Sequence, residues 1–203
     1  MAMNILKAKV PQMSEDEHKA RTARSYKLIL GFAMVSMTMM FAGLTSAWVV
    51  SKSRTDWMKN FEMPTPFYIS TAVIIGCSIS FYLAKRAIKQ DNRSLVTAML
   101  LLTLILGSLF AYFQIMGFEA MYDKKMFPVG GAGAITVSFI WVIVVAHLAH
   151  LAGGMISLLI IIYNHFKQKY HSGQTLGIEL GAMYWHFLDI LWLYLFLFLY
   201  FFK

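Results

Sequence analysis

The chain has 203 residues, of which 59% are hydrophobic and 14% are charged. This apolar fraction exceeds the roughly 45–50% of soluble domains, and the long uncharged runs indicate an integral membrane protein. The net charge of +8 does not indicate a nucleic-acid-binding protein, because the basic residues are spread over loops beside apolar segments. The single cysteine, Cys77, excludes an intramolecular disulfide and a thiolate cluster, and is expected to be a small packing residue in a helix.

Residues 1–27 are polar and of mixed charge, and we expect a cytoplasmic arm with a short helix leading into the membrane. Ser14 followed by Glu17 matches a capping box, which marks the start of a helix. Each of the apolar segments that follow approaches or exceeds the roughly 20 residues that cross a bilayer as a helix. The connections between them are too short to separate domains. The sequence therefore predicts an all-α protein, with one integral membrane bundle of five transmembrane helices over 28–203, at about 28–50, 67–84, 95–117, 133–163 and 180–202.

The distribution of lysine and arginine predicts the orientation of these helices, because basic residues are enriched in cytoplasmic loops. If the N-terminus is cytoplasmic, 12 of the 18 basic residues lie on the cytoplasmic side and 6 on the opposite side. The predicted topology therefore has a cytoplasmic N-terminus and a C-terminus on the other side of the membrane.

Two pairs of titratable residues interrupt the apolar segments. His147 and His150 lie one helical turn apart in the fourth segment, and His186 and Asp189 have the same spacing in the fifth. Both pairs lie about 10–15 Å inside the membrane, at 1.5 Å per residue. Because the two helices run antiparallel, we expect His186 or Asp189 to hydrogen-bond the His147/His150 face. Three interpretations stay open: an interhelical polar clamp, a site for a lipid headgroup or a proton, and ligation of a metal or haem.

Other polar residues have simpler expected roles. Glu179 begins the fifth segment, where a carboxylate complements the helix dipole, and Gln114 is expected to hydrogen-bond a neighbouring helix. His18, His165 and His171 stand in polar segments and are expected to be solvated. The sequence has no nucleophile with a neighbouring base, no phosphate-binding loop and no ordered set of metal ligands. We therefore predict no catalytic, cofactor-binding or metal-binding residue in this chain.

The most specific pattern in the chain is GIELGAMYWHFLDILW at 177–192. The fourth segment adds HLAHLAGG at 147–154, the third adds Leu106-Gly107 with Phe110 and Gln114, and the first adds MMFAGL at 39–44. On these residues the chain closely resembles subunit three of the haem–copper terminal oxidases, which are cytochrome c oxidases and quinol oxidases, in its short five-helix bacterial form. The resemblance covers about residues 28–203.

This resemblance implies a non-redox structural subunit of an enzyme complex that reduces oxygen and translocates protons in aerobic respiration. The implied partners are oxidase subunit one, subunit two and the small subunits, and membership of a larger respiratory supercomplex is compatible with the resemblance. No nucleic acid is implied as a partner. Haem and copper are implied in the partner subunits, and this chain is expected to bind phospholipid and to support stable proton uptake. The implied location is the bacterial cytoplasmic (inner) membrane, with the C-terminus periplasmic. This chain does not determine whether the electron donor is cytochrome c or quinol.

One position departs from the pattern of the family. Where the family usually carries a glutamate in this first helix, the chain has Met37, and no acidic residue occurs in 28–50. A role of that carboxylate in lipid contact or proton handling is therefore not expected here. Two other classes of function stay open. One is a stand-alone haem-binding electron carrier using His147, His150 or His186, and the other, less favoured, is a small proton-coupled transporter, since the broken helices and paired repeats of transporters are missing.

Overall fold

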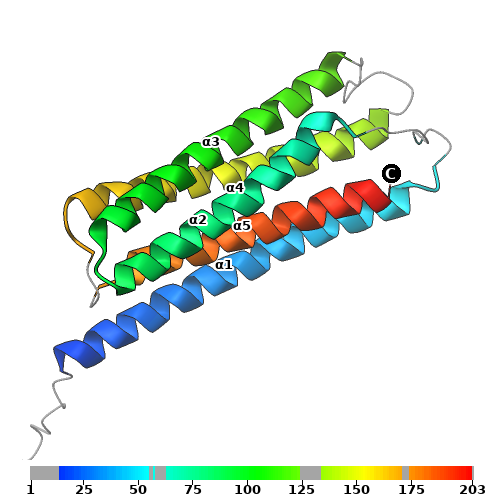
Figure 1. The fold of residues 1–203 in the computed structure, drawn as a ribbon. Coiled ribbons are helices and arrows are strands. Elements are labelled where there is room, and N and C mark those ends of the chain that lie inside the picture. Colours follow the sequence, from blue (N-terminus) through cyan, green and yellow to red (C-terminus); the bar gives the residue numbers. More distant parts are fainter. Residues whose placement is uncertain (1–13, 55–56, 58–62, 124–133, 171–173, 203) are drawn as a thin grey trace, which may run out of the picture.

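The computed structural model describes residues 14–54, 57, 63–123, 134–170 and 174–202, and these residues form five long helices. The helices are α1 (Glu15–Ser51), α2 (Thr65–Lys89), α3 (Arg93–Asp123), α4 (Ala134–Phe166) and α5 (Leu176–Phe201). Each is long and apolar enough to cross a membrane, so the predicted all-α bundle of five spanning helices is confirmed. Successive helices run in opposite directions (Figure 1), as short connections between spanning helices require.

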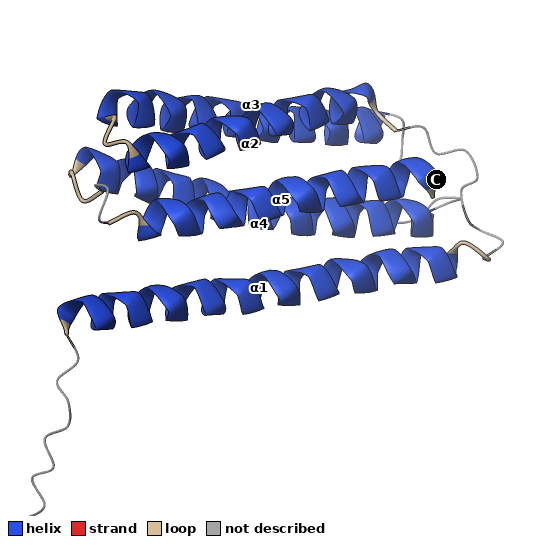
Figure 2. Ribbon diagram, turned by 60° about the horizontal axis from the view of Figure 1, so that its bottom comes forward, coloured by secondary structure: helices blue, strands red, loops and turns tan. Residues whose placement is uncertain are grey.

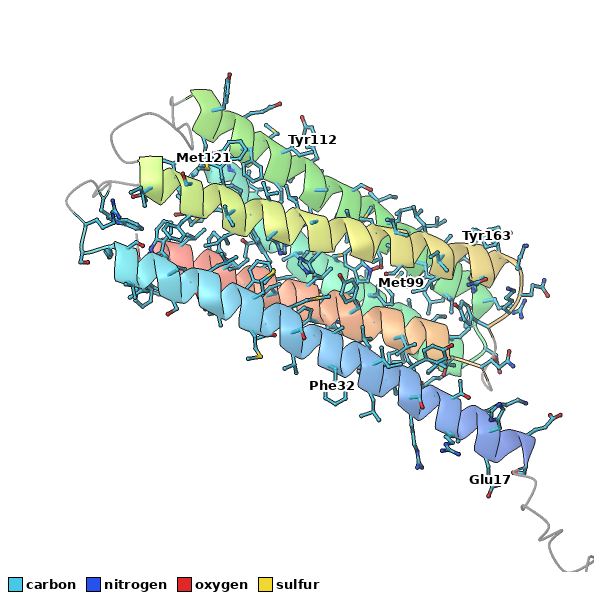
Figure 3. The ribbon with its side chains drawn as sticks, turned by 180° about the vertical axis from the view of Figure 1, so that it is seen from behind. Glu17, Phe32, Met99, Tyr112, Met121 and Tyr163 are labelled. Carbon is cyan, nitrogen blue, oxygen red and sulfur yellow. The ribbon has the colours of Figure 1, made fainter. Side chains whose placement is uncertain are left out.

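Helix α1 differs from the prediction because it begins at Glu15 and not near residue 28. The capping box explains this start: the Ser14 hydroxyl accepts a hydrogen bond from the Glu17 backbone N–H, and the Glu17 carboxylate accepts one from the Ser14 N–H. Residues 15–27 of the expected arm are therefore the first turns of the first membrane helix. They project beyond the rest of the bundle, with Glu17 near their tip (Figure 3).

The other helix ends agree with simple backbone rules. Pro66 lies in the first turn of α2, where its missing N–H is not needed by the helix. Asp91 has a φ of 52° in the tight connection between α2 and α3, and Gln168 has a φ of 56° just after α4, so both adopt the left-handed conformation that often follows a helix. The glycine-rich run at 130–133, which precedes α4 in the sequence, lies outside the described residues.

Four of the helices enclose a core. Helices α2 and α3 form a closely packed hairpin, α5 packs against α2 and α4, and α4 packs against α3. Rings of Phe67, Phe110, Phe118 and Trp192 meet near the centre of this group. Cys77 is buried there and its thiol donates to the Thr103 carbonyl at 3.6 Å, which is the packing position predicted for it.

Helix α1 lies along one side of the bundle (Figure 2), where it packs against α5 and α4. Phe41 of α1 enters a small apolar cluster with Ile143, Leu191 and Leu195. The opposite side of α1 is exposed, and Phe32 points away from the bundle (Figure 3) with 72% of its surface accessible. Large exposed apolar side chains occur on all five helices, which is the surface that a helix facing lipid or another membrane subunit presents.

Candidate functional site

His186 and Asp189 face α2. The His186 Nδ1 atom lies 2.7 Å from the Ser78 hydroxyl, in hydrogen-bonding contact, and 4.0 Å from the Asp189 carboxylate. Asp189 is buried, at 4% exposure. The predicted hydrogen bond from this pair to the His147/His150 face is therefore wrong. The physical reason is the rotation of α5: its α4-facing surface carries Tyr184 and Leu188, which contact Gly154, so residues 186 and 189 turn toward α2.

His147 is fully buried among aromatic rings. Its ring centroid lies 5.1 Å from that of Trp192 on α5 and 6.1 Å from that of Phe110 on α3. Both ring nitrogens are without a hydrogen-bond partner among the described residues. His147 thus joins α3, α4 and α5 through ring packing, where the sequence predicted hydrogen bonding.

The polar link between α4 and α5 involves His150 through its backbone. The Tyr184 hydroxyl donates to the His150 carbonyl at 3.0 Å, while the His150 Nδ1 atom lies 2.7 Å from the Ala146 carbonyl of its own helix. The His150 ring meets Phe41 of α1 edge-on at 5.7 Å. The rings of the three histidines therefore contact different helices: His147 meets α3 and α5, His150 meets α1, and His186 meets α2.

Two adjacent hydroxyl residues of α2 hold the neighbouring helices. Gln114 of α3 is buried, and its Nε2 donates to the Ser70 hydroxyl at 3.0 Å. Trp192 of α5 donates from Nε1 to the Thr71 hydroxyl at 3.0 Å. Sequence reasoning missed Ser70 and Thr71, because a hydroxyl in an apolar helix commonly bonds to its own backbone, and nothing in the pattern marks these two as partners of other helices.

Glu179 makes an ion pair between helices. The Lys27 ammonium group of α1 lies 2.7 Å from Glu179 Oε2, and the Thr175 hydroxyl donates to Oε1 at 2.9 Å. The position of Glu179 in the first turn of α5 is as predicted, and its carboxylate also binds α1, which sequence reasoning did not include. This pair connects α1 to the bundle at the end where α5 begins.

The predicted solvation of the three remaining histidines has a mixed outcome. His165 is buried at 7% exposure, and its Nε2 atom lies 2.8 Å from the Thr97 hydroxyl of α3, so the expectation of a solvated side chain is wrong there. The cause is the length of α4, which continues to Phe166 and keeps His165 against α3. His18 is exposed, and His171 lies outside the described residues.

Two adjoining hollows lie between α1 and the bundle. The first, of about 580 Å³, has His18, Lys19, Lys27 and Lys169 and one acidic residue, Glu179, in its lining. The second, of about 510 Å³, is mostly apolar and is lined by α1, α4 and α5, with Met37 among its residues. Tyr170 and Gly177 line both hollows, so the two meet end to end. Burial raises the pKa of the Tyr170 phenol.

Across the described part of the chain, no group of three or more His, Cys, Asp and Glu side chains is placed to hold a metal ion. Several polar groups inside the helices connect one helix to another, whereas both carboxylate oxygens of Asp189, like both ring nitrogens of His147, have no hydrogen-bond partner among the described residues. The fold therefore defines a class of protein: a multi-pass helical membrane protein with hydrogen bonds between its helices.

Comparison with known proteins identifies the family. The family model for cytochrome c oxidase subunit III matches residues 12–203. Cytochrome c oxidase subunit 3 of Spodoptera frugiperda is 31% identical over 140 residues, which are 69% of this chain and 89% of that protein. The subunit 3 proteins of Petromyzon marinus and Rhipicephalus sanguineus are each 32% identical over 69% of this chain, and the match spans about half of their length. The chain therefore belongs to the cytochrome c oxidase subunit III family, as its resemblance predicted.

Proposed function

We propose that this chain is the non-redox structural subunit of a proton-pumping haem–copper terminal oxidase, packing on oxidase subunit one. The observation that carries the proposal is the family match over residues 12–203. The interior of the bundle supports it, because the Ser70–Gln114, Thr71–Trp192 and Ser78–His186 contacts each join two helices. Subunit two and small subunits complete the complex, haem and copper reside in the partner subunits, and oxygen is reduced with electrons from cytochrome c or quinol.

A tagged copy of the chain tests this proposal. Purified in mild detergent, it should carry with it a larger subunit that shows haem absorption. A chain that purifies alone and without haem would contradict the proposal. The same sample addresses the haem-carrier alternative: after the partner subunits are stripped away, the remaining chain should have no Soret band, since His147, His150 and His186 contact different helices.

We place the N-terminus of the chain in the cytoplasm of a bacterium, with the bundle in the cytoplasmic membrane. The described basic residues support this orientation because most of them gather at one end of the bundle, where α1 starts and α2 ends. Cysteine labelling in intact cells tests it, since the native Cys77 is buried and should not react. A cysteine at Ser53 should react with an impermeant maleimide and one at Ser14 should not, and the opposite result would reverse the topology.

The two adjoining hollows support a phospholipid-binding role for this subunit. We assign the apolar hollow to acyl chains and the basic hollow to the phosphate of an anionic phospholipid. Lys27 is paired with Glu179 and Lys19 with Glu15, while Lys169 brings a further positive charge to the hollow, which suits an anionic headgroup. Met37 adds an apolar side chain to the wall of this hollow.

Filling the apolar hollow tests the lipid assignment. Gly153 lines it, so Gly153→Leu should displace the lipid and lower the phospholipid that stays with the purified complex. Gly43→Leu is the matched control. Gly43 of α1 does not line the hollow, and a Cβ atom at this position would have open space around it. Lys169→Gln should lower the retained anionic phospholipid without changing neutral phospholipid. Equal lipid content in Gly153→Leu and Gly43→Leu would contradict the assignment and leave the family membership untouched.

A further inference from the structure

Asp189 is the only acidic residue within the five predicted apolar segments of the sequence. It lies deep in the membrane, because Glu179 in the first turn of α5 precedes it by ten residues. That spacing is about 15 Å along a helix, close to half of the roughly 30 Å hydrocarbon thickness. Asp189 is 4% exposed, so its carboxyl group faces the interior of the bundle. An acidic side chain at this depth requires a partner that balances its charge.

No lysine or arginine can serve as this partner inside the membrane, because the same five segments contain neither residue. On α2 the titratable neighbour of Asp189 is the Cys77 thiol, which is not a cation. Helix α3 has no charged residue between 94 and 118. The two histidines of α4, His147 and His150, have their rings against aromatic side chains of other helices. His186 is therefore the remaining candidate for a counter-ion.

The geometry of His186 does not favour an ion pair. Its Nδ1 atom lies 4.0 Å from Asp189 Oδ2, which is beyond hydrogen-bond distance, and the same nitrogen is in contact with the Ser78 hydroxyl at 2.7 Å. Both carboxylate oxygens are without a hydrogen-bond partner among the described residues. A buried ion pair is favourable only when close geometry and additional hydrogen bonds offset the desolvation of both charges. A positive charge on the ring would also be repelled by Lys85 of α2.

We propose that Asp189 is a proton-binding site deep in the membrane: its carboxyl group holds a proton and is neutral in the folded subunit, with a neutral His186 beside it. In this state neither side chain brings a charge into hydrocarbon, where an ionised group is far more costly than a neutral one. The neutral carboxyl group also supplies a donor. The Ser78 hydroxyl lies beside both side chains, and it can accept from Asp189 while it donates to His186 Nδ1.

The proton is held at this site and is not conducted through the subunit. Trp185 and Trp192 lie one helical turn from Asp189 on either side along α5, and both are buried. Their rings separate the carboxyl group from the polar residues nearer the two membrane surfaces. Exchange of the proton with water therefore requires an opening of the helix packing, and it should be slow.

Infrared difference spectroscopy of the purified protein with its accompanying subunits locates this proton, because a neutral carboxyl group and an ionised carboxylate have separate stretching bands. At neutral pH, Asp189→Asn should remove the band of one neutral carboxyl group. Glu179→Gln is the matched control on the same helix. It removes a carboxylate that is paired with Lys27 at 2.7 Å, so the band lost should be that of an ionised carboxylate. Loss of an ionised carboxylate band in Asp189→Asn would overturn the proposal.

A second variant makes the test independent of the folding of Asp189→Asn. His186→Gln removes the candidate counter-ion and leaves Asp189 in place. The neutral carboxyl band should be equally strong in the wild type and in His186→Gln. If the wild type instead contained an ion pair, the band would appear only in His186→Gln, which would overturn the proposal. In heavy water the wild-type band should shift over minutes to hours, and a shift that is complete within seconds would overturn the assignment of a held proton.

Discussion

A tight contact between α2 and α3 makes Gly117 of α3 a sensitive position. A Cβ atom built at Gly117 would lie 2.5 Å from Cε1 and 2.6 Å from Cζ of Phe67 on α2. The Phe67 ring is 4% exposed and is held between Phe118, at a centroid distance of 6.5 Å, and Trp192, at 5.8 Å. The ring therefore has little room to move away, and Gly117→Ala should force α2 and α3 apart.

The size of the effect follows from two opposing terms. Overpacking a filled core costs about 1–3 kcal/mol, while replacing glycine by alanine within a helix contributes about 0.5–1 kcal/mol in the other direction. We expect Gly117→Ala to lower the free energy of unfolding by about 1–2 kcal/mol, since most of the overpacking cost remains. Gly76→Ala on α2 is the matched control, because its nearest neighbour would be Leu106 Cδ1 at an ordinary 3.7 Å, and it should be neutral or slightly stabilising.

Unfolding by sodium dodecyl sulfate, followed by tryptophan fluorescence, measures this difference for each purified variant. A second substitution, Phe67→Leu, removes the ring that the new methyl group meets. The double variant should be more stable than the sum of the single effects predicts, with a coupling energy above about 0.5 kcal/mol. Equal stability of Gly117→Ala and Gly76→Ala, or the absence of coupling to Phe67, would refute the close approach of α2 and α3 at this point.

Further predictions concern the polar contacts between helices. Thr71→Val removes the acceptor for the Trp192 indole N–H and should lower the free energy of unfolding by about 1–2 kcal/mol in the same titration, whereas Thr38→Val, which loses only a bond to its own helix, should change it by less than about 0.5 kcal/mol. Equal effects would show that the Trp192 bond contributes nothing. Lys27→Gln breaks the ion pair to Glu179, whose partners are 42% and 21% exposed, and should cost about 0.5–1 kcal/mol. This loss should shrink as salt is added, and a loss that does not depend on salt would argue against an ion-pair origin.

The number of helices and their apolar spans could be predicted from the sequence. The hydrocarbon core of a membrane requires a minimum length and an apolar composition of each spanning helix, and both can be recognised in each segment separately. The start of α1 shows the limit of this reasoning. The capping box at Ser14 and Glu17 was recognised, but the polar composition of residues 15–27 favoured a separate arm. The structure continues the helix through them, since charged residues are compatible with a helix that extends beyond the membrane surface.

Partners across helices were the part that the sequence could not determine. Spacing placed His186 and Asp189 on one face of α5 correctly, yet the rotation of that face toward α2 depends on where Tyr184 and Leu188 pack against Gly154. One helix carries about 100° of rotation per residue, so an error of one residue in packing redirects a side chain to another neighbour. Periodicity within a segment therefore predicts shared faces, while the neighbour of a face depends on the packing of the whole bundle.

The contacts of α1 join the proposed roles of this chain into one physical picture. This helix packs only against α4 and α5 within the described bundle, and polar contacts join it to α5 at two levels. Lys27 pairs with Glu179 in the first turn of α5. Nearer the C-terminal end of α1, Thr45 lies 2.7 Å from the Tyr194 hydroxyl, and the Trp48 indole donates to the carbonyl of Phe202, which caps α5.

Between these two levels, residues 26–37 of α1 line the apolar hollow, and Phe41 then packs against α4 and α5. A helix segment beside a hollow of this volume gains packing when acyl chains fill it, because side chains that face an empty space lack dispersion contacts on that side. Lipid in the hollow would therefore stabilise the packing of α1 on α4 and α5, and displacing that lipid by Gly153→Leu should weaken it.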